Sequence, residues 1–334
     1  MSKLTRKGGC LVAAALSSIT LLGISAHTAC AQSTYPDRAI TIVVGYPPGG
    51  SVDLTGRVFA DALAKQLDAK VVIENLGGAG GTIGAQKVIR ATPDGYTLLV
   101  GSLNEIVIAE NVNPAVKYNG SNDLQAIGLI GDQPLLLAAS KESGITSPVD
   151  LVNLVKSNKS ADYSYGSSGV GTSLHLAGEM INAVTQGQFM HVPYRGVAPL
   201  VTDLASGRIG LGMFVLSSGL PQVTSGQMVP LGVTSAERSS FAPDIPALSE
   251  TPELKDIDIS VWFGLFAPNG LSAEVTEKLR VGMAGVLADP DFQEKYAATG
   301  STVMTTQPDL PAFFEAEQIK FKKLAEIADI LAEK

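Results

Sequence analysis

The sequence predicts an α/β protein of two lobes, each a mostly parallel sheet flanked by helices, joined by a two-strand hinge. Short apolar strands alternate with helical stretches in both halves of the chain, which is the pattern of right-handed βαβ units. Two turns rich in glycine and serine, within 41–53 and 163–173, each follow a strand-like run and open a helix. The chain ends in helices with no further sheet to cover, so we expect them to return to the first lobe.

The individual elements follow from hydrophobic periodicity and from helix start signals. Strands are expected at 41–44, 71–73, 96–100, 126–130, 135–139, 163–165, 191–194, 209–215, 228–234 and 257–266. Helices are expected at 52–67, 82–90, from 147, 173–181, 199–206, 274–287 and 311–333. The chain would cross between the lobes near Pro134 and Ile259. This predicts one lobe from 32–134 plus 260–334 and a second from 135–259.

The first 31 residues have the layout of a secretory signal peptide. Lys3, Arg6 and Lys7 precede an apolar stretch, and Ala29-Cys30-Ala31 supplies small residues for cleavage after Ala31. The apolar stretch is shorter than the roughly 20 residues needed to span a bilayer. We therefore expect a soluble, exported protein. Lipidation of Cys30 is an alternative, although His27 is bulkier and more polar than a lipidation signal prefers.

Composition excludes several function classes. Both cysteines, Cys10 and Cys30, precede the proposed cleavage site, which leaves no thiol for disulfides, metal ligation or catalysis. The net charge is −8 and no basic run occurs, so we expect no nucleic-acid partner. His175 and His191 have no companion at metal-ligand spacing, so we expect no metal and no cofactor.

The two glycine- and serine-rich turns predict an anion site between the lobes. A helix N-terminus presents unpaired N–H groups and the positive end of the helix dipole, which favours a carboxylate or phosphate. The loop 166–173 lacks the Gly-Lys-Ser/Thr of a P-loop, and 166–170 ends in valine where a nucleophile elbow has glycine. Hydroxyl and N–H groups without a lysine suit a carboxylate better than a triphosphate.

Taken together, these segments resemble the Bug-type solute-binding proteins, the periplasmic receptors of tripartite tricarboxylate transporters. The matching motifs are Tyr35-Pro36-Asp37-Arg38, Pro47-Pro48-Gly49-Gly50, Gly77 to Gly84, Pro93 to Leu98, Ser168 to Thr172, Val192 to Gly196, Gly232 to Ser235 and Trp262-Phe263-Gly264. The resemblance implies a Venus-flytrap receptor that closes over a small carboxylate and delivers it to a membrane permease without chemistry.

The resemblance also implies which residues bind the ligand. In the first lobe they are Tyr46, Pro48, Gly49, Gly50, Ser51 and Ser102. In the second they are Ser167, Ser168, Gly169 and Thr172. Many relatives have an acidic residue where this chain has Val215, and such a residue could hold the ammonium group of a ligand. We therefore expect a ligand without an amino group: a mono- or dicarboxylate, aromatic acids included. Arg195 is either a further carboxylate contact or a solvated edge.

Other residues in these motifs have structural interpretations. Asp53 is expected to cap its helix, since a carboxylate facing an anion would repel it. The glycine-rich segment 77–84 is interpreted as a turn for close packing rather than as a ligand contact. Trp262 is interpreted as a residue that packs at the hinge. We expect a monomer.

Two other functions stay open from sequence. The first is an exported hydrolase or isomerase that uses the same cleft. The second is a sensory subunit that presents its liganded form to a sensor kinase.

Overall fold

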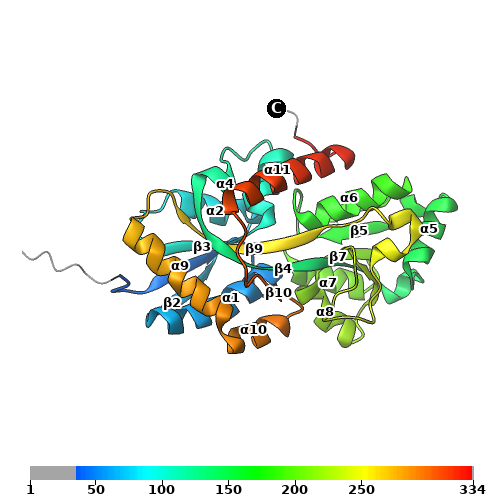
Figure 1. Ribbon diagram of the computed structural model, residues 1–334. Coiled ribbons are helices and arrows are strands. Elements are labelled where there is room, and N and C mark those ends of the chain that lie inside the picture. The colour runs from blue at the N-terminus through cyan, green and yellow to red at the C-terminus, as the bar shows by residue number, and fades with distance from the viewer. Residues whose placement is uncertain (1–34, 333–334) are drawn as a thin grey trace, which may run out of the picture. The chain divides into compact units, whose positions relative to one another are not determined.

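A ten-stranded sheet in two parts organises the chain over residues 35–332, which this computed structural model describes (Figure 1). The proposed signal peptide and its cleavage site lie outside the described residues. The first part holds β1 (Ile40–Val44), β2 (Val71–Asn75), β3 (Thr97–Ser102), β9 (Ser260–Pro268) and β10 (Thr302–Val303). The second holds β5 (Ser164–Ser167), β6 (Met190–Pro193), β7 (Leu211–Val215) and β8 (Val229–Val233). Strand β4 (Leu124–Ala139) belongs to both parts.

The predicted parallel pairing is confirmed in both parts, with antiparallel strands between them. β1 lies parallel to β2 and β3, and β5 lies parallel to β6 and β7. β9 pairs antiparallel with both β3 and β4, and β4 pairs antiparallel with β7 and β8. Because parallel strands end at the same sheet edge, the loops after β1 and β3 open together, as do the loops after β5 and β7.

The strands expected on either side of Pro134 form one continuous strand. Pro134 stands opposite Ser260 at the last β4–β9 pair, and from Leu135 onward β4 pairs with β7 and β8. A proline at this change of partners removes no ladder hydrogen bond, so it does not end the strand. Thr234 joins the two crossing segments here, since Leu135 N–H donates to its Oγ1 and its hydroxyl donates to the carbonyl of Ile259 at 2.5 Å.

Helices cover both parts of the sheet. Around the first part lie α1 (Ser51–Leu67), α2 (Thr82–Ile89), α3 (Ala109–Val112), α4 (Gly120–Asp123), α9 (Ala273–Ala288), α10 (Pro290–Ala297) and α11 (Leu310–Ile327). Around the second lie α5 (Pro148–Lys156), α6 (Ser173–Thr185), α7 (Val197–Ala205) and α8 (Leu216–Thr224). As expected, the C-terminal helices return to the first part, where α9 and α10 pack against α1.

Helix α10 was not expected from the sequence. The Asp289 side chain accepts a hydrogen bond from Asp291 N–H, and Pro290 occupies the first helical position. An acidic N-cap followed by proline is a helix start signal rather than a simple break. Within residues 35–332, no helix has the length and apolar character to cross a bilayer.

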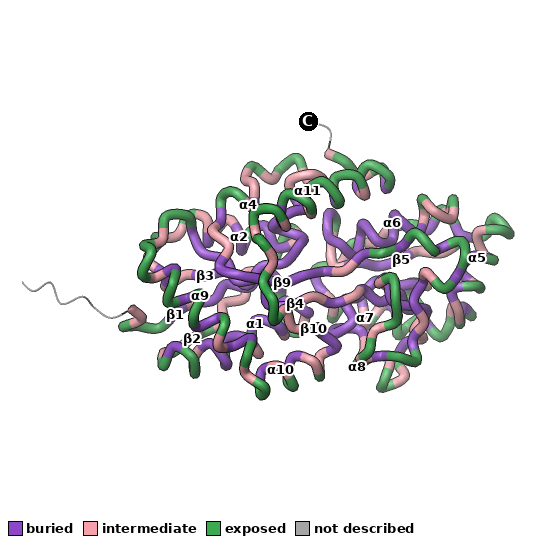
Figure 2. The backbone as a smooth tube through the Cα atoms, viewed as in Figure 1, coloured by how far each residue is buried: buried purple, intermediate pink, exposed green. Residues whose placement is uncertain are grey.

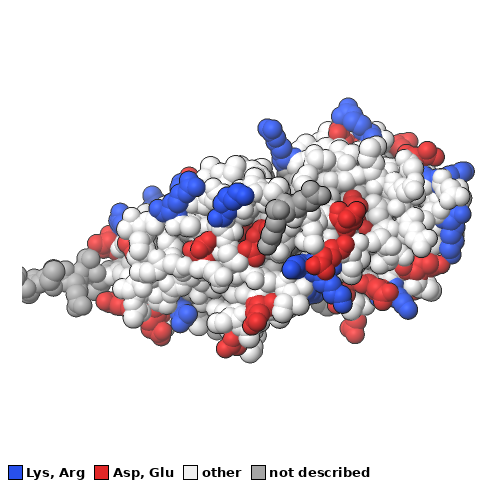
Figure 3. Space-filling model, turned by 90° about the horizontal axis from the view of Figure 1, so that it is seen from above, with Lys and Arg blue, Asp and Glu red and all other residues white. Residues whose placement is uncertain are grey.

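Buried residues follow the strands of both parts of the sheet (Figure 2). Trp262 on β9 packs against Phe266 and against Phe313 and Phe314 of α11, and its indole N–H donates to Glu317 at 2.7 Å. Trp262 therefore has a packing role, and these contacts are with α11, around the first part of the sheet. On the face seen in Figure 3, acidic and basic side chains are interspersed over the surface.

Candidate functional site

A cavity lies where the loops after β1 and β3 meet the loops after β5 and β7, and it encloses about 470 Å³, open solvent included. Its polar lining includes Gly50 and Ser51 at the start of α1, Asn104 after β3, Ser168 after β5 and Ser218 of α8. Tyr46 lies on the same wall. Residues of both predicted turns therefore meet in one place, although they are more than 110 residues apart in sequence.

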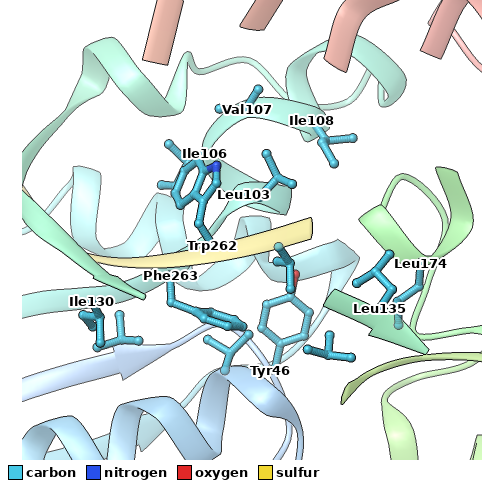
Figure 4. Close-up of a cluster of buried hydrophobic side chains, with 14 of the residues drawn as sticks. Tyr46, Leu103, Ile106, Val107, Ile108, Ile130, Leu135, Leu174, Trp262 and Phe263 are labelled. Carbon is cyan, nitrogen blue, oxygen red and sulfur yellow. The ribbon is translucent and has the colours of Figure 1, made fainter. Parts of the chain in front are cut away.

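The rest of the wall is mainly apolar. Leu174, Val197, Val215, Val261 and Phe263 contribute side chains from α6, α7, β7 and β9. Figure 4 shows Tyr46, Leu174 and Phe263 with the buried side chains around them. Among the described residues, no charged side chain lines this cavity. Its chemistry is that of hydrogen-bond donors set in an apolar wall, which suits a small ligand with one polar end.

The N-terminus of α1 is open toward this cavity. Gly50 is the N-cap, and within the described part of the chain no side chain caps the helix. The preceding Gly49 N–H is occupied, because it donates to Asp53 Oδ2 at 2.9 Å. The first N–H groups of a helix have no intrahelical acceptor. Ser51 and Val52 line the cavity, where a bound anion would satisfy such N–H groups.

Asp53 lies in the first turn of α1, as expected, but its carboxylate holds the preceding loop and does not cap the helix. Its carboxylate accepts hydrogen bonds from Gly49 N–H, from Asn75 Nδ2 at 2.8 Å and from Arg57 Nε at 3.0 Å. Burial opposes ionisation of this group, but the bonds from Arg57, Gly49 and Asn75 prevail and lower the pKa of Asp53. The charge is therefore held against the loop and does not line the cavity.

In the second turn, the hydroxyls of Ser167 and Thr172 shape the loop rather than line the cavity. The Ser167 hydroxyl is within hydrogen-bond distance of Gly169 O and of His191 Nε2, at 3.1 and 2.7 Å. Thr172 is the N-cap of α6, and its hydroxyl donates to Gly169 O at 2.9 Å. Both side chains are buried. The hydroxyls of serine and threonine satisfy loop backbone readily, which a motif match does not distinguish from ligand binding.

Three further residues expected to bind lie outside the cavity wall. Pro48 and Gly49 are exposed and do not line the cavity. Ser102 is fully buried, and its hydroxyl donates to Glu105 Oε2 at 2.6 Å. The structure therefore places these three residues outside the cavity lining, although each is close in sequence to a residue that lines it.

Asn104 and Glu105 were not found by sequence reasoning. They belong to a π-helical turn, Asn104–Ile108, directly after β3. Asn104 Nδ2 donates to Tyr46 Oη at 3.0 Å, and its Oδ1 accepts from Ser173 N–H at 2.7 Å. One amide therefore joins the first turn to the start of α6. Single π turns are rare and often occur at functional sites, but no residue pattern announces them.

A wider groove adjoins the cavity and shares Tyr46, Pro47, Ser168 and Gly196 with it. It is lined by glycines 77, 78, 80 and 81 and by residues 168–170 and 193–196, and it encloses about 1340 Å³ with open solvent. Arg195 is exposed on its wall, with no ion pair found among the described residues. The glycine loop also packs as expected, since a Cβ on Gly84 would come within 2.7 Å of Gly45 Cα.

The two histidines form a stacked pair behind the second turn. The rings of His175 and His191 lie 3.9 Å apart, and His191 also stacks on Tyr165. His175 Nδ1 accepts from Gly171 N–H at 3.2 Å, so this nitrogen carries no proton. Burial lowers the pKa of His191 to about 3. The described residues contain no group of three or more His, Cys, Asp or Glu placed to hold a metal.

Comparison with known proteins agrees with this architecture. Residues 55–329 match the family model described as the tripartite tricarboxylate transporter family receptor. The chain belongs to this receptor family. Protein BugT of Bordetella pertussis is 30% identical over 90% of this chain and 92% of its own. A protein of Pseudomonas sp. strain P51 is 32% identical over 87% of this chain and 86% of its own.

Solved structures show that this receptor shares the two-lobed fold of periplasmic binding proteins. The periplasmic binding protein BugD is 30% identical, with a TM-score of 0.83 over 90% of this chain and all of its own. A Rhodopseudomonas palustris protein with adipate is 29% identical, with a TM-score of 0.85 over 89% of this chain and 99% of its own. MatC of the same species, with bound malate, is 25% identical, with a TM-score of 0.80 over 88% of this chain and all of its own.

Proposed function

We propose that this receptor captures a small organic carboxylate in the cavity between α1 and the loop after β5. The observation that carries the proposal is the uncapped start of α1, whose first residues line an uncharged cavity together with Ser168 and Asn104. N–H groups at a helix start bind a carboxylate without any cationic side chain, because the helix dipole adds to their hydrogen bonds.

The apolar wall favours a ligand with a hydrocarbon body. Val197, Val215, Val261 and Phe263 would contact the chain or ring between or beyond the carboxyl groups. Val215 offers no charge to a ligand ammonium group, so we propose a mono- or dicarboxylic acid without an amino group, aromatic acids included. The adipate and malate of related structures are acids of this type.

Arg195 would act on the anion before it enters. Its guanidinium lies in the outer groove and not in the cavity wall. A cation there attracts approaching anions and raises the association rate more than the final affinity. The glycine loop would form the opposite side of this entrance.

We further propose that the two parts of the sheet are the two lobes, 32–134 plus 260–334 and 135–259, and that they close on the ligand about the paired β4 and β9. The receptor would be a periplasmic monomer, with its signal peptide cleaved after Ala31. It would deliver the acid to the membrane permease of the transporter, without chemistry on the ligand.

A thermal-shift screen tests this function. The panel pairs adipate, malate and benzoate with their uncharged amides, and it includes aspartate. An acid that binds raises the melting temperature, and its uncharged amide does not. At a ligand concentration of a hundred times the Kd, the free energy of unfolding rises by about 2.7 kcal/mol. Equal shifts by acids and amides, or turnover of an ester without any shift, would contradict the proposal. Loss of uptake in a strain lacking the receptor would separate transport from sensing.

A further inference from the structure

The π turn buries an acidic side chain directly behind the cavity wall. Glu105 is 1% exposed, and its carboxyl packs so closely on Gly81 that a Cβ there would lie 2.7 Å from Oε2. Ser102 supplies two of its hydrogen bonds, from N–H to Oε1 at 2.8 Å and from the hydroxyl to Oε2 at 2.6 Å. Among the described residues, no lysine, arginine or histidine is found in contact with this carboxyl.

The hydroxyl of Tyr46 has fewer protons than its neighbours require. Tyr46 Oη lies 2.8 Å from the carbonyl oxygen of Gly80 and 3.2 Å from Glu105 Oε2. It also accepts a hydrogen bond from Asn104 Nδ2. A phenol has one proton to donate. If Glu105 is ionised, that proton serves either Gly80 or Glu105, and the other contact brings two lone pairs together.

A proton on Glu105 Oε2 satisfies every member of this network. The acid then donates to Tyr46 Oη, Tyr46 donates to the carbonyl of Gly80, and Ser102 still donates to both carboxyl oxygens. A buried polar network is most stable when each group has a partner. Burial supports the same state independently, because it raises the pKa of Glu105 to about 7 despite the bonds from Ser102 and Tyr46.

We propose that Glu105 is held as a neutral carboxylic acid behind the carboxylate cavity, and that its loss of a proton weakens binding of the anionic ligand. The inference rests on the proposed function, because it concerns the same cavity. Glu105 is a positioning residue: it contacts Tyr46, which lines the cavity, and neighbours Asn104, which joins Tyr46 to α6.

The surrounding charges give the sign of the effect. The hydroxyl of Tyr46 faces the carboxyl, and that of Tyr118, from the segment before α4, donates to the backbone carbonyl of Glu105. Glu110 on α3 adds negative potential near Tyr118. On α11, which packs against the same turn, Glu317 is engaged with Trp262. With no cation contacting Glu105 in the described structure, its ionised form repels an anion in the cavity.

The magnitude follows from Coulomb's law. For two charges separated by roughly 8 Å at an effective dielectric constant of about 20, repulsion weakens binding by about ten- to thirtyfold. Affinity for a carboxylate is therefore expected to fall as pH rises through neutrality. Because the two equilibria are linked, ligand binding is also expected to take up a proton near neutral pH.

Titration calorimetry with adipate and with malate, from about pH 5.5 to about pH 8.5, tests the linkage. In the wild-type protein, Kd is expected to rise about tenfold or more across this range. Glu105→Gln keeps the donor toward Tyr46 and cannot ionise, so its Kd is expected to stay within about twofold of the low-pH wild-type value. Glu277→Gln, on the exposed surface of α9, is the matched control and should follow the wild type. The same pH dependence in Glu105→Gln would overturn the proposal.

Infrared difference spectroscopy gives a readout that does not require ligand. At about pH 6, wild type minus Glu105→Gln is expected to show the carbonyl stretch of a buried protonated carboxylic acid, lost at about pH 9. A carboxylate band at both pH values would overturn the proposal even if the acids bind. If no acid of the thermal-shift panel binds at any pH, the proposed function fails and the linkage fails with it, while the infrared band still decides the protonation state.

Discussion

Replacing Gly50 with aspartate should abolish carboxylate binding and leave the fold intact. Gly50 has φ −83° and ψ 168°, an extended conformation open to any residue. A Cβ there would meet nothing closer than Pro47 O at 3.9 Å and Val197 Cγ2 at 4.0 Å. An aspartate at the N-cap accepts hydrogen bonds from the first turn of α1, so it would occupy the donors that the proposed ligand needs.

The size of the effect follows from the donors lost. Two charge-assisted hydrogen bonds at about 1.5 to 3 kcal/mol each amount to at least about 3 kcal/mol, which is about a hundredfold or more in Kd. Added repulsion between two carboxylates acts in the same direction. The melting temperature should be unchanged or slightly higher, because aspartate is a better N-cap than glycine by a few tenths of a kcal/mol.

Two neighbouring variants serve as controls, with Kd measured by calorimetry and stability by urea unfolding. Gly50→Ala adds a Cβ without an acceptor and should bind within a few-fold of wild type. Gly50→Asn supplies a neutral acceptor, and its Kd should lie between those of Gly50→Ala and Gly50→Asp. Wild-type affinity in Gly50→Asp, or an equal loss in Gly50→Ala, would refute the role of the α1 N-terminus.

Four further changes have expected outcomes. Val215→Asp should weaken binding of dicarboxylates at least tenfold relative to Val215→Asn, since it places a charge in the cavity wall; equal Kd values would remove this position from the site. Arg195→Gln should lower the association rate at low salt and change Kd less than about threefold. Stopped-flow measurements should find no difference in association rate from the wild type at high salt. Trp262→Phe should cost about 1 to 3 kcal/mol in urea unfolding by leaving Glu317 without its indole partner, with Kd unchanged. Burial raises the pKa of Glu105 from 4.5 to about 7, so the stabilisation by its neutral form is complete below about pH 4.5 and is lost as pH rises to about 7. The free energy of unfolding of Glu105→Gln should therefore rise by about 3 kcal/mol relative to that of the wild type between these pH values. A difference that does not change with pH would contradict this.

The sequence predicted the alternating architecture well because hydrophobic periodicity reports burial directly. It missed the continuity of β4 because Pro134 normally ends a strand, whereas here it stands where pairing partners change. It missed α10 because Asp289-Pro290 was interpreted as a break between helices rather than as the start of one. These elements depend on tertiary pairing and capping geometry, which local patterns represent only in part.

The candidate site, like the fold, was predicted only in part. The glycine and serine motifs located the two turns that meet in the cavity, and Gly50, Ser51 and Ser168 line it. The motifs did not separate these residues from Ser167, whose hydroxyl is used within its own loop. Asn104 was missed because a π turn, and not a sequence signature, brings its side chain to the wall.

A crystal structure with bound adipate or malate tests the central claim most directly. We expect one ligand carboxylate within about 3.2 Å of the N–H groups of Ser51 and Val52, with Ser168 or Asn104 as a further donor. A carboxylate held by Arg195 in the outer groove, with the first turn of α1 left to solvent, would contradict the account.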